Sequence, residues 1–140
     1  MHVTDELLKK IASELELGLR VFVHRETFEV IAVPTEEDLE LGDPELWETD
    51  LDRIGAVPGA FVLFEPMDSS EAFSVMEAYA GTVADPGFST QLKAALLQPK
   101  PFARFYEVIN RAGAYRERWF AFKQEAVNQW LRQKWARLFE

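Results

Sequence analysis

The sequence predicts an α+β fold in which a small, mostly antiparallel three-stranded sheet is covered by helices. Runs rich in Val, Ile and Phe gather in the first half of the chain, whereas helical periodicity fills the second half. The 140 residues are 48% hydrophobic and include no cysteine, which excludes disulfide scaffolds, thiolate zinc sites and iron–sulfur clusters. We expect one globular domain over residues 1–140.

Short local patterns define the elements of the first half. Thr4 is a suitable N-cap for a helix whose apolar residues recur at helical spacing, and Gly18 is placed to end that helix. Arg25-Glu26-Thr27 is short enough to join two strands as a hairpin. The second of these strands stops at Pro34, because proline cannot donate a hydrogen bond to the ladder. The three predicted strands are residues 19–24, 28–33 and 60–64.

Helix start signals organise the rest of the chain. Asp43-Pro44 and Asp85-Pro86 each place a capping carboxylate before a proline, which fits the first position of a helix. Asp68-Ser69-Ser70-Glu71 has the spacing of a capping box. A further helix follows Pro101, and a last one begins near Ala114. The C-terminal half is therefore predicted to be entirely helical.

Acidic and basic side chains are segregated along the chain, whose net charge is −9. Residues 1–70 carry 5 Lys and Arg against 17 Asp and Glu, whereas residues 71–140 carry 10 against 7. The acidic side chains are densest in residues 36–52, which we call the acidic segment: it holds nine carboxylates and no Lys or Arg. Its expected interaction residues are Glu45, Glu48 and Asp52.

Three interpretations of this segregation stay open. The acidic segment is a solvated surface, or it docks on the basic C-terminal helices, within the chain or between two copies. Alternatively, the basic helices bind nucleic acid, which the net charge of −9 disfavours because the phosphates repel it. Nucleic-acid binding requires one continuous exposed patch made by Arg104, Arg111, Arg118 and Lys123.

The last predicted helix carries more aromatic residues than one buried face holds. Most of them are expected to build the core. Trp135 and Phe139 are left as candidates for a partner surface or a dimer contact, because tryptophan is common among interface anchors. Glu125 lies near the aromatic face of the same helix, so we expect it to form a buried ion pair with Arg104 or Arg118.

No catalytic or metal-binding pattern stands out. His2 and His24 are the only histidines, and His24 is expected to be a locally hydrogen-bonded side chain at the end of a strand. An enzyme would need a buried carboxylate, Glu125 or Glu65, to converge with His24 in one pocket. We predict no cofactor and no metal.

Two helical motifs resemble the C-terminal signature of a family of uncharacterised bacterial proteins. Phe102-Ala103-Arg104-Phe105 is similar to the family's Gly-Ala-Phe-Arg-Arg-Phe helix, and the run from Trp119 to Ala126 is similar to its Trp-Tyr-x-Phe-x-x-Glu-Ala helix. Pro99-Lys100-Pro101 stands where the family has glycine before the first motif, and the family's hairpin glycine is replaced near Phe28. The resemblance implies the same order of elements and supplies no activity, since the family has none assigned.

The sequence therefore predicts a cytoplasmic binding domain, whose partner is another protein or a second copy of the chain. Its expected working surfaces are the acidic segment and the basic, aromatic-rich C-terminal helices, where Arg104, Arg118 and Lys123 are further interaction residues. No apolar run approaches the roughly 18 residues that a membrane-spanning helix needs, so a membrane partner is not expected. The two alternative functions are a small enzyme with a buried carboxylate and a regulator associated with nucleic acid.

Overall fold

The computed structural model describes residues 4–139, and the chain divides into two compact units. Unit 1 comprises residues 1–66 and 128–140, and unit 2 comprises residues 67–127. Each unit has a hydrophobic core built from its own residues. The expectation of one domain over residues 1–140 stays a prediction.

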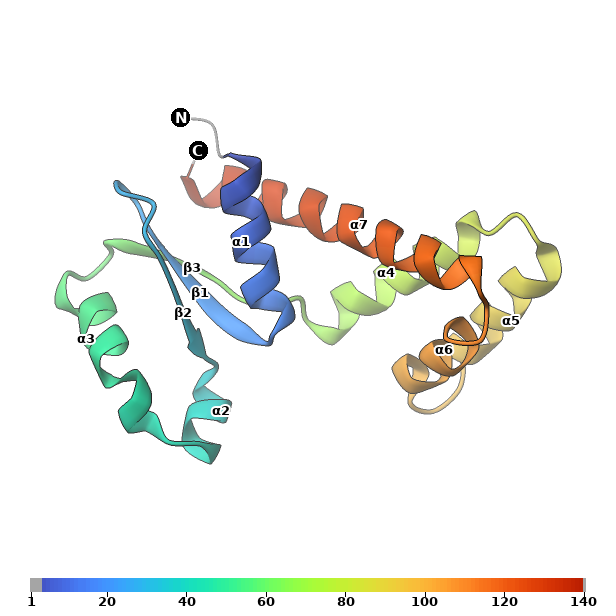
Figure 1. The fold of residues 1–140 in the computed structure, drawn as a ribbon, viewed down its shortest axis with the longest axis horizontal. Helices are drawn as coiled ribbons and strands as arrows, with labels where there is room; N and C mark the ends of the chain where they lie inside the picture. The colour runs from blue at the N-terminus through green and yellow to red at the C-terminus, as the bar shows by residue number, and fades with distance from the viewer. Residues whose placement is uncertain (1–3, 140) are drawn as a thin grey trace. The chain divides into compact units, whose positions relative to one another are not determined.

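Unit 1 contains the sheet, which confirms the predicted α+β class and the antiparallel pairing of three strands (Figure 1). The strands are β1 (Leu19–His24), β2 (Val30–Pro34) and β3 (Phe61–Phe64), in the order β2-β1-β3. In the central strand, Val21 lies opposite Ala32 of β2 and Phe64 of β3. β2 begins two residues later than predicted, because Phe28 still belongs to the hairpin turn and has a φ of 60°.

One face of the sheet is buried. The alternating side chains Val21 and Val23 of β1 are fully covered, as expected of a strand with one buried face. Helix α1 (Asp5–Glu16) packs against β1 through its apolar stripe, which includes Leu8 and Ile11. The Oγ1 of Thr4 accepts a hydrogen bond from the N–H of Leu7 at 3.2 Å, so the predicted N-cap is confirmed.

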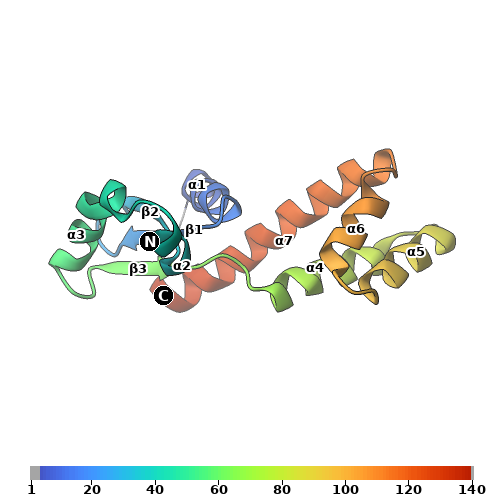
Figure 2. The same cartoon turned by 90° about the horizontal axis from the view of Figure 1, so that it is seen from below.

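Three short helices follow β2. They are α2 (Glu36–Leu41), the 3₁₀ helix η1 (Pro44–Trp47) and α3 (Glu48–Ala56). Both α2 and α3 contact β2, the edge strand of the sheet, and the views in Figure 1 and Figure 2 show α1 and α3 on different sides of the strands. None of these three helices has a fully buried residue, so they contribute little to the core.

Unit 2 is built from helices alone. It contains α4 (Ser69–Thr82), α5 (Pro86–Leu96), α6 (Pro101–Ile109) and the first part of α7 (Ala114–Phe139), and the predicted all-helical C-terminal half is confirmed. The capping box of Asp68 and Glu71 is present at the start of α4. Trp119 lies at the centre of the core, with its ring centroid 4.9 Å from that of Phe105 and 5.4 Å from that of Tyr79.

Candidate functional site

The acidic segment, residues 36–52, forms α2, η1 and the start of α3 in unit 1. Local capping explains this layout, because Thr35 accepts a hydrogen bond from the N–H of Asp38 and Asp43 accepts one from the N–H of Glu45. The three predicted interaction residues Glu45, Glu48 and Asp52 are all exposed. The structure therefore presents the segment as three short, solvated helices rather than as an irregular loop.

The carboxylates of the acidic segment are largely without cationic partners. Arg20 of β1 lies 3.9 Å from Glu36, and it is the only base that pairs with the segment among residues 4–139. The excess of negative charge belongs to unit 1, which carries 17 Asp and Glu against 8 Lys and Arg, whereas unit 2 carries seven of each. A concentrated negative charge of this kind steers the approach of basic partners.

Large apolar side chains stand exposed in and beside the acidic segment. Leu41 is 82% exposed, Leu46 is 76% exposed, and Val57 at the end of α3 is 63% exposed. By contrast, Leu51 and Ile54 of α3 are half-buried. The sequence patterns did not single out Leu41 and Leu46. Neither residue fits the helical apolar pattern of its neighbours, and this mismatch is the signal that could have identified them.

The expectation that Trp135 provides a partner surface is wrong. Trp135 is only 2% exposed, and its ring stacks on Phe139 at a centroid distance of 4.0 Å and on Phe64 at 6.0 Å. Phe28 lies 5.6 Å from the same ring. Phe139 is half-buried in this cluster as well, so the aromatic surplus of α7 completes the core of unit 1.

The expected burial of an ion pair between Glu125 and Arg104 is wrong, because both residues are exposed. Arg104 pairs with Glu107 at 3.2 Å within α6. The physical reason is helical phase: Val127 is on the buried stripe of α7, and a residue two positions earlier points about 200° away from it.

Three of the four basic residues proposed for nucleic acid border three different hollows. Arg111 borders a depression together with Asp85 and Glu107, whereas Arg118 borders a different one. Lys123 lines a third pocket, and Arg104 is paired with Glu107. The two carboxylates beside Arg111 weaken the case for a phosphate-binding surface there.

His24 and Glu65, two residues of the alternative enzyme, have different surroundings. The Nδ1 of His24 accepts hydrogen bonds from the N–H groups of Glu26 and Thr27, at 3.1 and 3.2 Å, so its predicted local role at a strand end is confirmed. Glu65 is exposed and lies in a hollow beside Lys134 and Arg137, of which His24 is not a lining residue.

Tyr79 is the titratable group whose environment differs most clearly from water. Burial in the core of unit 2 raises its pKa above the usual 10.0, and this effect outweighs the nearby Arg118 guanidinium, which lowers it. Its hydroxyl donates a hydrogen bond to the carbonyl oxygen of Tyr115 at 2.8 Å. Tyr79 is thus a neutral structural group that ties α4 to the start of α7.

The described part of the chain offers no metal-ligand cluster, since no three of its His, Asp and Glu residues are grouped to hold an ion. Within the same residues, no helix has the length and apolar character needed to cross a membrane. No protein-family model, curated protein or solved structure matches the chain. The resemblance to the uncharacterised bacterial family stays a prediction.

Proposed function

We propose that the protein is a protein-binding module that uses its acidic segment to recognise a basic, partly apolar surface on another protein. The observation that carries the proposal is the presence of Leu41 and Leu46, both more than three-quarters exposed, among nine carboxylates without a Lys or Arg. Solvated acidic surfaces need no exposed leucines, whereas interfaces combine an apolar centre with charged complementarity at the rim.

A different protein fits this surface better than a second copy of the chain. Unit 1 has an excess of nine negative charges, and unit 2 has equal numbers of acidic and basic residues, so neither offers a net positive surface. The removal of Trp135 from the list of exposed residues leaves the acidic segment as the interaction surface of the proposal. We place the module in the cytoplasm as part of the same proposal, which fractionation of cells that express the tagged chain tests.

Affinity capture with three variants tests the proposed function. The first variant reverses charge at Glu45, Glu48 and Asp52 to Lys, and the second replaces Leu41 and Leu46 with Ser. The matched control reverses Glu16, Glu77 and Glu117 to Lys, which are exposed acidic residues outside the segment, so its net charge changes equally. All variants are expected to fold with stability within about 0.5 kcal/mol of the wild type, because the substituted side chains are exposed.

A partner of the segment is retained by the wild type and by the matched control, and lost by both segment variants. The charge-dependent part of the affinity falls between 0.15 and 0.5 M salt, since screening acts over about 8 Å at physiological ionic strength. A protein retained equally by all four chains contradicts the proposal. Concentration-dependent sedimentation of the wild type, abolished in both segment variants, would instead assign the surface to self-association.

A further inference from the structure

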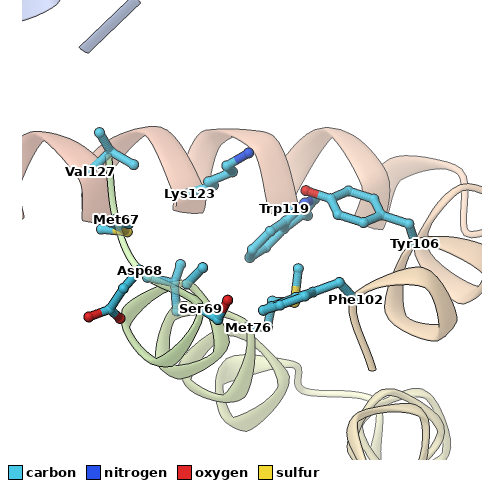
Figure 3. A pocket seen from close by; sticks show the side chains of 11 residues that line it. Met67, Asp68, Ser69, Met76, Phe102, Tyr106, Trp119, Lys123 and Val127 are labelled. Carbon is cyan, nitrogen blue, oxygen red and sulfur yellow. The ribbon is translucent and has the colours of Figure 1, made fainter. Parts of the chain in front are cut away.

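Unit 2 contains a pocket that has no part in the function proposed for the acidic segment. Its volume is about 260 Å³, and it is lined by residues of α4, α6 and α7 together with residues that lead into α4. Figure 3 shows the rings of Trp119 and Phe102 and the thioethers of Met67 and Met76 around this space. Because the pocket opens to solvent and its lining is mainly apolar, a ligand with an apolar body can enter it.

The lining combines a mainly apolar wall with unused hydrogen-bond donors. Trp119 is 1% exposed, and its Nε1 has no acceptor within residues 4–139. The hydroxyl of Tyr106 and the ammonium of Lys123 also make no hydrogen bond or ion pair in that range. A buried N–H without an acceptor costs free energy. The Nε1 of Trp119 is itself covered by protein atoms, so the donors that a ligand can reach are the hydroxyl of Tyr106 and the ammonium of Lys123.

Lys123 and Trp119 lie one helical turn apart on the same face of α7, and Figure 3 shows the Lys123 side chain running along α7 in the direction of Trp119. The one carboxylate in the lining, Asp68, accepts a hydrogen bond from the N–H of Glu71 at 2.8 Å as the cap of α4. It forms no ion pair with Lys123, so the ammonium is available to an anionic ligand.

We propose that this pocket binds a small amphipathic monocarboxylate, with its apolar body between α4 and α6 and its carboxylate at Lys123. A carboxylate is acceptor-only, which matches the ammonium of Lys123 and the phenol of Tyr106 in the lining. A cavity of about 150 Å³ holds benzene, so a cavity of 260 Å³ holds a body near the size of an eight-carbon chain. Methionine side chains adapt to such bodies because they are flexible and polarizable.

Titration of the full-length chain with octanoate and with octan-1-ol, followed by NMR of the tryptophan indole N–H groups, tests this proposal. The Trp119 signal is assigned by its loss in Trp119→Phe. With octanoate it is expected to shift in a saturable way, while the signal of Trp47, in η1 of unit 1, stays in place. Octan-1-ol is expected to bind more weakly than octanoate, because it carries no charge for Lys123.

Two variants and a control separate the head group from the apolar body. Lys123→Met keeps the length of the side chain and is expected to weaken octanoate binding about tenfold while leaving octan-1-ol unchanged. Ala72→Phe fills the cavity and is expected to abolish binding of both probes. Lys93→Met, at an exposed position of α5, is expected to bind octanoate like the wild type.

Three results overturn the proposal: no saturable shift with octanoate at millimolar concentration, equal octanoate affinity in Lys123→Met, or binding of octan-1-ol that exceeds that of octanoate. None of them bears on protein capture by the acidic segment, which lies in unit 1 and is unchanged in these variants.

Discussion

At the scale of single residues, each unit has a buried tryptophan in its core. Trp119 and Trp135 are each almost fully covered, one in each unit, and the Nε1 of each is without a hydrogen-bond partner among residues 4–139. In unit 1 the indole of Trp135 is enclosed by other rings, which leaves its N–H a structural cost. In unit 2 the ring of Trp119 lines the pocket, whereas its Nε1 is covered by protein atoms and is likewise a structural cost.

Tyr79 makes stability depend on pH in the alkaline range. Because burial raises its pKa in the folded chain, the unfolded chain loses the phenol proton first, and stability falls as pH rises above 10.0. Tyr79→Phe is expected to cost about 1 kcal/mol at pH 7 through the lost hydrogen bond to Tyr115, and to reduce the loss of stability above pH 10. Urea unfolding of both chains between pH 7 and 11 measures the two slopes; identical slopes would show that Tyr79 is not their source.

At the scale of elements, the features that were predictable are those set by neighbours in sequence. Thr4 caps α1, Asp68 and Glu71 form the capping box of α4, and Asp85 caps α5, each through contacts no more than three residues apart. The failures involve distant partners. Trp135 is buried by Phe28 and Phe64, which precede it by 107 and 71 positions, and no local pattern in α7 announces those rings.

Backbone conformation at two loops bears on the predicted family resemblance. Phe28 and Lys100 are the non-glycine residues with positive φ in the described chain, at 60° and 57°. The predicted family resemblance expects glycine near these two places. Left-handed backbone is the conformation that glycine adopts without a steric penalty, so glycine would fit both turns.

The start of α6 therefore stores strain that glycine relieves. Lys100 is exposed and left-handed, and Lys100→Gly is expected to stabilise the chain by about 0.5 to 1 kcal/mol, the relief of strain less the added entropy of the unfolded chain. The matched variant Lys93→Gly replaces an exposed lysine within α5 and is expected to cost about 1 kcal/mol. Thermal unfolding ranks the two variants. A loss of stability in both variants would show that the backbone at Lys100 is not strained.

At the scale of the whole molecule, charge and core are divided between the two units. Unit 1 holds the sheet, the acidic segment and the excess of negative charge, and unit 2 holds the pocket with balanced charge. The segregation of charge was visible in the sequence because it needs only counting. The assignment of residues 128–139 to unit 1 was not, because it depends on the packing of Trp135 on rings encoded far upstream.

Two matched core variants test whether the units unfold separately. Ile11 of unit 1 and Ile109 of unit 2 are both 0% exposed, and replacing either with Val is expected to cost about 1 kcal/mol. Hydrogen exchange is expected to rise in β1 to β3 with Ile11→Val and in α4 to α6 with Ile109→Val, because each core is local to its unit. If either variant accelerated exchange across residues 4–139, the chain would behave as the one domain expected from its sequence.

The division of unit 1 into two stretches of chain sets an order for biosynthesis. As the ribosome releases the polypeptide, every residue of unit 2 emerges before Trp135 and Phe139, which close over Phe28 and Phe64. Unit 2 is therefore able to fold while the rings of Phe28 and Phe64 in unit 1 are still exposed to solvent. The nascent protein is thus most exposed to premature association during the synthesis of the intervening helices, when chaperone protection matters most.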